Sequence, residues 1–169
     1  MRSLVKRIEL VANLAIIVVA IMLGVVLVKT YRRSSAAQTT ATAAVRPGTK
    51  LSLPGVDWKA NGRTLVMALS TQCHFCSESA QFYQRVAQER TRAGSLRLVA
   101  VLPQPVDESQ QYLKELGVTV DDVKQLRLDS IGVNGTPTLI MANSEGIVAD
   151  SWRGKLSDEK ELEVIARLK

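Results

Sequence analysis

Two cysteines, Cys73 and Cys76, are the residues whose type and spacing most directly suggest chemistry. They form a C-x-x-C pair that follows a predicted buried strand and begins a predicted helix, a context typical of a redox pair. Unpaired N–H groups at a helix start favour negative charge, and therefore the nucleophilic thiolate. We expect Cys73 to attack a disulfide and Cys76, one turn further along, to resolve the mixed disulfide.

Other uses of a cysteine pair fit the sequence less well. A structural zinc site needs four ligands, whereas the chain offers two cysteines and one histidine, so no metal site within one chain is expected. Covalent haem attachment needs C-x-x-C-H, but Ser77 follows Cys76. Two buried free cysteines without a role remain the alternative. No cofactor is expected beyond a redox-active Cys73–Cys76 disulfide.

Two further features lie near the pair or could be brought to it. His74 stands between the cysteines, where a cationic imidazole would lower the pKa of Cys73; an exposed histidine without a role is the alternative. Thr136 and Pro137 come directly before a predicted strand. An X-Pro bond at a strand entry is a candidate for the cis isomer, although trans is the general rule.

Alternating strands and helices must position these residues. Strands are expected over Thr64–Ser70, Leu96–Leu102, Thr138–Ala142 and Ile147–Trp152, and helices over Cys73–Thr91, Asp107–Leu116 and Ser157–Leu168. We expect Asp107 and Ser157 to cap their helices and Phe75 to join the apolar face of the first. Residues 118–133 are ambiguous. The order predicts an α/β fold with three layers, a central mixed sheet with helices on both faces.

The N-terminal part of the chain has a different character. Residues 11–28 hold no charged side chain, so we predict a short flank over 1–9, a transmembrane anchor helix over 10–30, a flexible linker over 31–50 and a folded domain over 51–169. A cleaved signal peptide is the alternative. It usually has a shorter apolar run, followed at once by small residues, whereas Lys29, Arg32 and Arg33 follow here.

Charge is unevenly distributed along the chain. Residues 1–50 carry eight Lys or Arg and one Glu, whereas residues 51–169 carry 14 Lys or Arg and 15 Asp or Glu. The basic character therefore belongs to the flanks of the apolar run. A nearly neutral domain lacks the basic surface that nucleic-acid binding needs, so no nucleic-acid partner is expected.

The two motifs, in this order, resemble the thioredoxin superfamily, and more closely its membrane-anchored TlpA and ResA-like thiol–disulfide oxidoreductases. The resemblance covers roughly residues 48–169 and is carried by LVMALSTQCHFC, GVNGTPTLIM and SEGIVADSWRGKL. It implies a thioredoxin-like fold with a helical insertion over about Pro103–Gly117, a cis Pro137 packed against the redox pair, and main-chain groups of Thr136 that bind a substrate strand.

The resemblance also implies location and partners. Its members are commonly held by one N-terminal helix and face the periplasm or outer surface, so a single-pass protein of the cytoplasmic membrane with an extracytoplasmic domain is expected. Its partners would be protein thiols or disulfides and a membrane electron donor or acceptor. The sequence departs from the family at Thr71-Gln72, where a tryptophan often stands. Glu78 does not match the family's buried acid and is expected to be an exposed helix residue.

Three functions compete on this basis. The leading prediction is a membrane-tethered extracytoplasmic thiol–disulfide oxidoreductase that acts on protein substrates. A peroxiredoxin-like thiol peroxidase shares much of the fold but carries P-x-x-x-T-x-x-C, whereas Thr71 lies two residues before Cys73 and the proline is missing. The third candidate is a non-catalytic thioredoxin-like module that binds a partner or carries a metal between two chains.

Overall fold

The computed structural model describes residue 22 and residues 45–169. The predicted anchor over 10–30, apart from Met22, lies outside the described residues, as does most of the predicted linker. Within the described residues, no helix is long and apolar enough to cross a bilayer.

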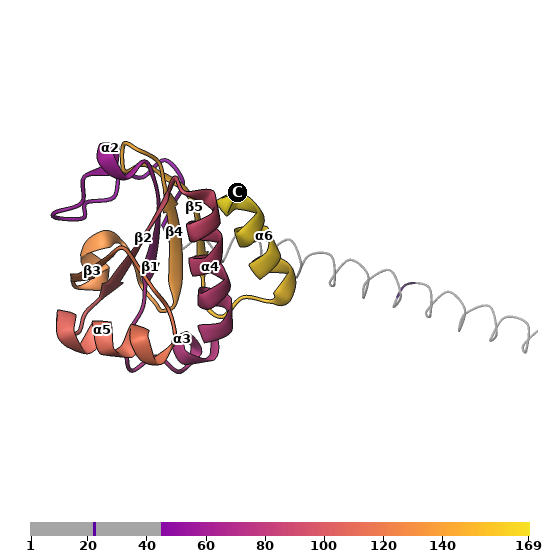
Figure 1. The fold of residues 1–169 in the computed structure, drawn as a ribbon. Helices are drawn as coiled ribbons and strands as arrows, with labels where there is room; N and C mark the ends of the chain where they lie inside the picture. The colour runs from indigo at the N-terminus through magenta and orange to yellow at the C-terminus, as the bar shows by residue number, and fades with distance from the viewer. Residues whose placement is uncertain (1–21, 23–44) are drawn as a thin grey trace, which may run out of the picture. The chain divides into compact units, whose positions relative to one another are not determined.

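A five-stranded mixed sheet forms the centre of the domain (Figure 1). Its strands are β1 (Arg63–Ala68), β2 (Leu96–Leu102), β3 (Asp122–Gln125), β4 (Thr138–Ala142) and β5 (Val148–Arg153), in the order β3-β2-β1-β4-β5. β1 and β2 are parallel, as are β2 and β3, whereas β4 runs antiparallel to both of its neighbours, β1 and β5. The four strands expected from sequence are confirmed, and β3 lies in the ambiguous segment.

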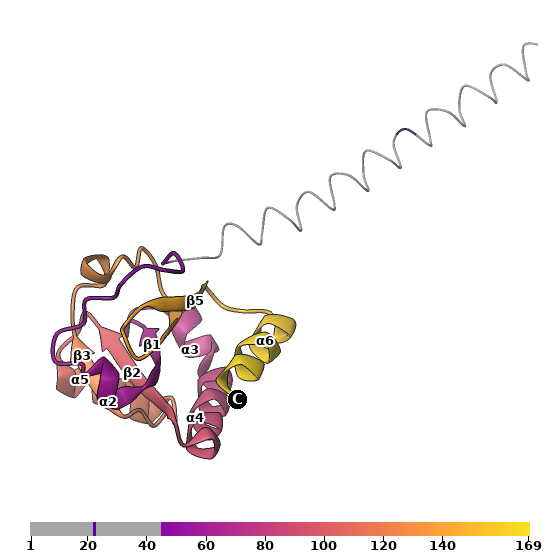
Figure 2. The same cartoon turned by 90° about the horizontal axis from the view of Figure 1, so that it is seen from above.

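The two faces of the sheet are covered differently. Alternate residues of β1 point to opposite faces, so Leu65 and Met67 join one core cluster and Val66 and Ala68 the other. The helices α4 (Ala80–Ala93), α5 (Val106–Glu115) and α6 (Asp158–Leu168) place buried side chains in the first cluster. Figure 2 shows α4 and α6 next to each other, in agreement with their packing contacts.

Short elements cover the second face. Its cluster takes side chains from residues 45–56, from α2 (Trp58–Asn61) and from a 3-10 helix over Leu128–Ile131. Helical segments therefore lie on both faces, although on this face they are short and are joined by extended chain. Residues 45–50 belong to the folded domain: Val45 is buried and exchanges hydrogen bonds with Ser151, and Gly48 donates to Val148 O at 2.8 Å.

The helices differ from expectation in three places. The single helix predicted over Cys73–Thr91 is divided at Ser79 into α3 (His74–Glu78) and α4, and Gly94 ends α4 with a φ of 65°. The predicted cap by Asp107 is wrong, because α5 begins one residue earlier and Pro105 occupies the cap position. Ser157 does precede α6, but its hydroxyl makes no capping hydrogen bond.

Candidate active site at the start of α3

Cys73 lies at the junction between β1 and α3. It is the N-cap residue of α3, with extended backbone angles, and its sulfur accepts a hydrogen bond from the Cys76 N–H at 3.2 Å. Its own N–H donates to Ser70 O at 3.1 Å. The side chain is partly exposed. A partly exposed cysteine at the start of a helix can be reached by an incoming disulfide.

Cys76 lies behind Cys73 and is fully buried, with no exposed surface. The pKa of the Cys76 thiol is raised from 9.0 to about 12, mainly by burial and next by the hydrogen bond with Cys73. Hydrogen bonds from the Ser70 N–H and from the Thr136 side chain act in the opposite direction. Cys76 therefore stays protonated at neutral pH, and the two sulfurs hydrogen-bond to each other.

The loop before β4 reaches the same sulfur pair. The Thr136 side chain hydrogen-bonds to Cys76, and the Thr136–Pro137 peptide bond is cis, as expected. Pro137 is buried, and its carbonyl oxygen accepts the Gly154 N–H at 2.7 Å. The structure thus brings together Cys73, Cys76 and the loop of Thr136 and Pro137, which are 60 residues apart in the sequence.

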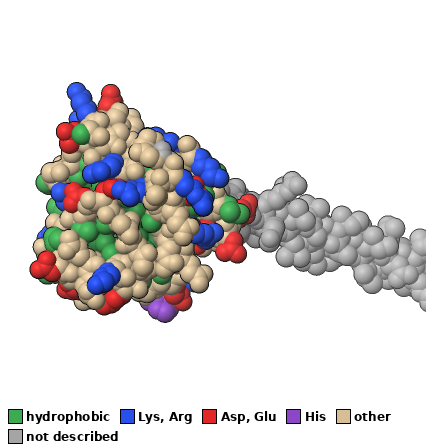
Figure 3. All heavy atoms as spheres, viewed as in Figure 1, with side chains coloured by type: hydrophobic (Ala, Val, Ile, Leu, Met, Phe, Trp, Pro, Cys, Tyr) green, Lys and Arg blue, Asp and Glu red, His purple; other side chains and the backbone are tan. Residues whose placement is uncertain are grey.

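His74 points to a different partner. Its side chain is 79% exposed, and Nε2 lies 3.1 Å from Glu78 Oε1, one turn along α3. Glu78 also pairs with Lys155 Nζ at 3.0 Å, and this contact is the main reason why the pKa of Glu78 is lowered. Glu78 is exposed, as expected, and is not a buried acid. The proposed tuning of Cys73 by His74 stays a prediction. Figure 3 shows the histidine standing out from the lower end of the domain.

The position of Phe75 differs from the prediction that it joins the apolar face of the first helix. Its side chain is 53% exposed, whereas Tyr83 and Val86 of the same predicted face are buried. The division at Ser79 accounts for the difference, because it lies between Phe75 and these two residues, so that the spacing of one continuous helix does not apply to Phe75. An aromatic side chain therefore lies at the surface between the two cysteines.

Two buried tyrosines surround Cys76 and were not singled out from the sequence. Tyr83, on α4, is 1% exposed, and its hydroxyl makes no hydrogen bond of normal geometry in the part of the chain that the structure describes. The nearby Ser79 hydroxyl donates to Phe75 O at 2.8 Å. Tyr112, on α5, shares a hydrogen bond with Ser77 at 3.2 Å. Burial raises the pKa of both phenols, and the charge of a Cys76 thiolate would add to it. Helical spacing from Cys76 could not indicate Tyr83, because the division at Ser79 lies between them.

No metal-binding cluster accompanies these groups. Among residues 45–169, no three His, Cys, Asp or Glu side chains gather where a metal ion could be held.

Comparison with known proteins finds relatives only by structure. No family model matches the sequence, and no curated protein matches it. The domain is similar to the thioredoxin domain of a thiol–disulfide oxidoreductase from Bacteroides vulgatus (TM-score 0.56, 14% identity, 73% of this chain and 97% of that one). It is similar to a thiol:disulfide interchange protein from a Bacteroides species (TM-score 0.53, 16% identity, 75% of this chain and 89% of that one). A secreted thiol–disulfide isomerase from Corynebacterium glutamicum is also similar (TM-score 0.51, 17% identity, 64% of this chain and 71% of that one).

The sheet order, the position of Cys73 and Cys76 at the start of α3 and these likenesses define residues 45–169 as a thioredoxin fold. The resemblance to the thioredoxin superfamily is thereby confirmed for the fold. The solved structures that it matches are named as a thiol–disulfide oxidoreductase, a thiol:disulfide interchange protein and a thiol–disulfide isomerase.

Proposed function

We propose that this protein is a thiol–disulfide oxidoreductase that exchanges disulfides with protein substrates through Cys73 and Cys76. One observation carries the proposal: a partly exposed Cys73 sulfur accepts the Cys76 N–H at 3.2 Å, with the fully buried Cys76 behind it. Exposure differs between the two sulfurs as a nucleophile and a resolving thiol require. The similar solved structures support the same activity by their names.

The reaction takes place in two exchanges. The Cys73 thiolate attacks one sulfur of a substrate disulfide, the substrate S–S bond breaks, and the other substrate sulfur leaves as a thiolate. The Cys76 thiolate then attacks Cys73, a Cys73–Cys76 bond forms, and the second substrate sulfur leaves and takes up a proton. Two electrons pass from the dithiol to the substrate. The reverse sequence oxidises a substrate dithiol.

The Cys73–Cys76 pair is regenerated by a partner. In the reducing direction, we propose a membrane electron donor that supplies two electrons; in the oxidising direction, a membrane acceptor removes them. The apolar run over 10–30 supports a single-pass anchor in the cytoplasmic membrane, and the secreted relative from Corynebacterium glutamicum supports an extracytoplasmic domain. In this arrangement the main-chain groups of Thr136 bind the substrate next to Pro137.

The roles of the two cysteines can be tested separately. Cys73→Ser and Cys76→Ser variants of the full chain are each incubated in detergent with oxidised glutathione. The intact mass of each variant is then recorded. Cys76→Ser is expected to retain one glutathione on Cys73, because the resolving thiol is absent, whereas Cys73→Ser gains little. Equal labelling of both variants, or of neither, would contradict the proposal. Rapid stoichiometric loss of hydrogen peroxide with the reduced wild type would favour the peroxidase.

A further inference from the structure

We propose that Gln104 is a positioning residue for the redox pair, holding Ser70 and Thr71 so that the main chain around the two sulfurs stays fixed. The inference rests on the proposed function. Gln104 lies in the segment between β2 and α5, 31 residues after Cys73 and 28 residues after Cys76. No sequence motif connects it to them.

Both ends of the Gln104 amide contact the redox loop. Nε2 donates to Ser70 Oγ at 3.1 Å, and Oε1 accepts the Thr71 N–H at 3.4 Å. An amide carries a donor and an acceptor on one planar group, so Gln104 can donate to the hydroxyl and accept from the adjacent N–H at once. The Ser109 hydroxyl in turn donates to Gln104 O at 3.3 Å, which fixes Gln104 at the start of α5.

Ser70 contacts both cysteines. Its carbonyl oxygen accepts the Cys73 N–H at 3.1 Å, and its N–H donates to the Cys76 sulfur. A movement of the Ser70 main chain would therefore change the surroundings of both sulfurs. The effect is larger for Cys76, because a fully buried thiolate has no water to replace a lost N–H donor.

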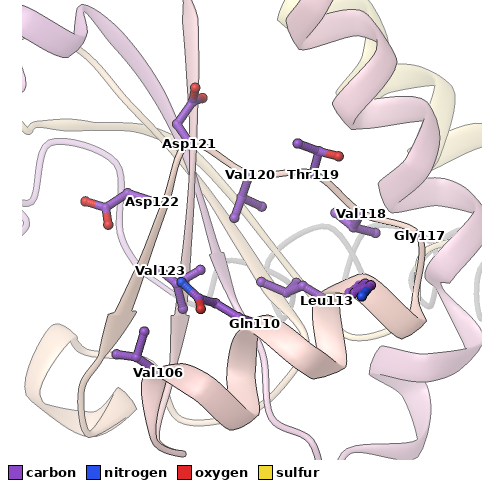
Figure 4. Close-up of a pocket in the computed structure, with 11 residues that line it drawn as sticks. Val106, Gln110, Leu113, Gly117, Val118, Thr119, Val120, Asp121, Asp122 and Val123 are labelled. Carbon is purple, nitrogen blue, oxygen red and sulfur yellow. The ribbon is translucent and has the colours of Figure 1, made fainter.

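One face of α5 strengthens the same connection. Thr71 Oγ1 donates to Glu108 Oε1 at 3.0 Å, and Ser77 Oγ lies 3.2 Å from Tyr112 OH. Glu108 and Tyr112 are four residues apart and share a helix face. The other face of α5, with Gln110, lines a hollow of about 590 Å³ against β3 (Figure 4). A substitution there leaves the redox loop untouched and serves as a control.

The resolving step is where Gln104 should matter most. Cys76 must lose its proton before it attacks Cys73, and the Ser70 N–H is one of the groups that favour its thiolate. If Gln104 holds that N–H in place, loss of the Gln104 amide raises the pKa of Cys76. A general loosening of the loop would instead admit water to Cys76 and lower its pKa. The two explanations therefore predict opposite signs.

The experiment follows both sulfurs in one reaction. The reduced full chain in detergent is mixed rapidly with dithiobis-nitrobenzoate, whose released thiolate is coloured. The first equivalent reports the attack by Cys73, and the second the attack by Cys76. Gln104→Met preserves the size of the side chain without its hydrogen bonds. We expect the second phase to slow by about threefold, as a pKa rise of half a unit gives, and the first phase to change less. Gln110→Met should match the wild type in both phases.

Ser70→Ala provides a second variant in case Gln104→Met folds poorly. It removes the hydroxyl that Gln104 binds, so it should slow the second phase in the same direction. The double variant should be slowed by less than the product of the single effects, because both remove one shared contact. In a Cys73→Ser background, the thiolate absorbance of Cys76 at a fixed alkaline pH should fall when Gln104→Met is added.

Three results would overturn the inference. The first is an unchanged second phase in Gln104→Met. The second is slowing of both phases by one factor, and the third is more Cys76 thiolate in the variant than in its parent. If the wild type itself releases no second equivalent, the proposed function fails, and the inference fails with it.

Discussion

At the scale of single residues, the two cysteines differ in their surroundings. Cys73 is partly exposed at the start of α3, and Cys76 is fully buried with its pKa raised to about 12 by burial. The proposed order of the two exchanges follows from this difference, because a substrate can reach the partly exposed Cys73 but not the fully buried Cys76.

The raised pKa of Cys76 predicts a loss of stability at high pH. The unfolded chain releases this proton near pH 9.0, whereas the folded chain keeps it to about 12. Stability is therefore unaffected below pH 9 and falls between these values, by at most about 1.4 kcal/mol per pH unit. Urea unfolding of the reduced full chain, followed by tryptophan fluorescence, measures the slope. Cys76→Ser should show a shallower slope, and equal slopes would contradict the assignment.

The two tyrosines near Cys76 should respond differently to loss of their hydroxyls. The Tyr83 hydroxyl is buried without a hydrogen bond of normal geometry, so Tyr83→Phe should be neutral or stabilising by up to about 1 kcal/mol. Tyr112→Phe is its matched control, and should destabilise by about 1 kcal/mol because it leaves Ser77 without this partner. Urea unfolding of the two variants at neutral pH measures both changes in the free energy of unfolding. A clear loss of stability in Tyr83→Phe would show a hydrogen bond that this geometry lacks.

At the scale of elements, the sequence predicted the parts that short-range patterns determine. Four strands and the α4 end at Gly94 were found because apolar runs and a glycine mark them locally. The division at Ser79 was missed because no proline or glycine stands there; the Ser79 hydroxyl bonds back to Phe75 O within the helix. The cap at Pro105 was missed because Asp107 is the more common capping type.

One buried carboxylate ties three elements together. The Asp121 side chain, just before β3, is 5% exposed and accepts the Leu98 N–H of β2 at 2.8 Å and Arg90 Nε of α4 at 3.0 Å. Asp121→Ala should therefore cost about 2 kcal/mol or more in the free energy of unfolding, since it leaves two donors without their acceptor. The adjacent Asp122 is 39% exposed and pairs with Lys124 at 2.9 Å, so Asp122→Ala should change stability by less than about 0.5 kcal/mol. Equal effects in urea unfolding would contradict this account.

The candidate site was predicted in part, for a physical reason. The C-x-x-C pair is local in sequence, and the family resemblance indicated Thr136 and a cis Pro137. The structure shows the Thr136 side chain hydrogen-bonded to Cys76 and the Thr136–Pro137 bond in the cis form. Ser70, Gln104 and Tyr112 could not be found, because their contacts join segments that only the folded sheet brings together. Phe75 was placed wrongly because its exposure depends on the division of the helix.

At the scale of the whole molecule, the apolar run over 10–30 predicts retention in a membrane. The full chain, expressed in a bacterium, should sediment with membranes and resist extraction by high salt and alkaline carbonate, because burial of a long apolar helix outweighs surface charge. A membrane-impermeant thiol reagent added outside the cytoplasmic membrane should label Cys73 in intact spheroplasts. A soluble product that begins after residue 30 by mass spectrometry would contradict the anchor and support a cleaved signal peptide.

The most direct test of the central claim is a redox titration of the full chain. The protein is equilibrated with glutathione buffers of increasing oxidation, quenched with an alkylating agent and weighed intact. We predict one two-electron transition to an intramolecular Cys73–Cys76 disulfide, with a potential between roughly −270 and −120 mV. Two results would contradict the assignment of these two sulfurs as one redox pair. Both cysteines could remain open to alkylation in every buffer, or each could acquire glutathione independently of the other.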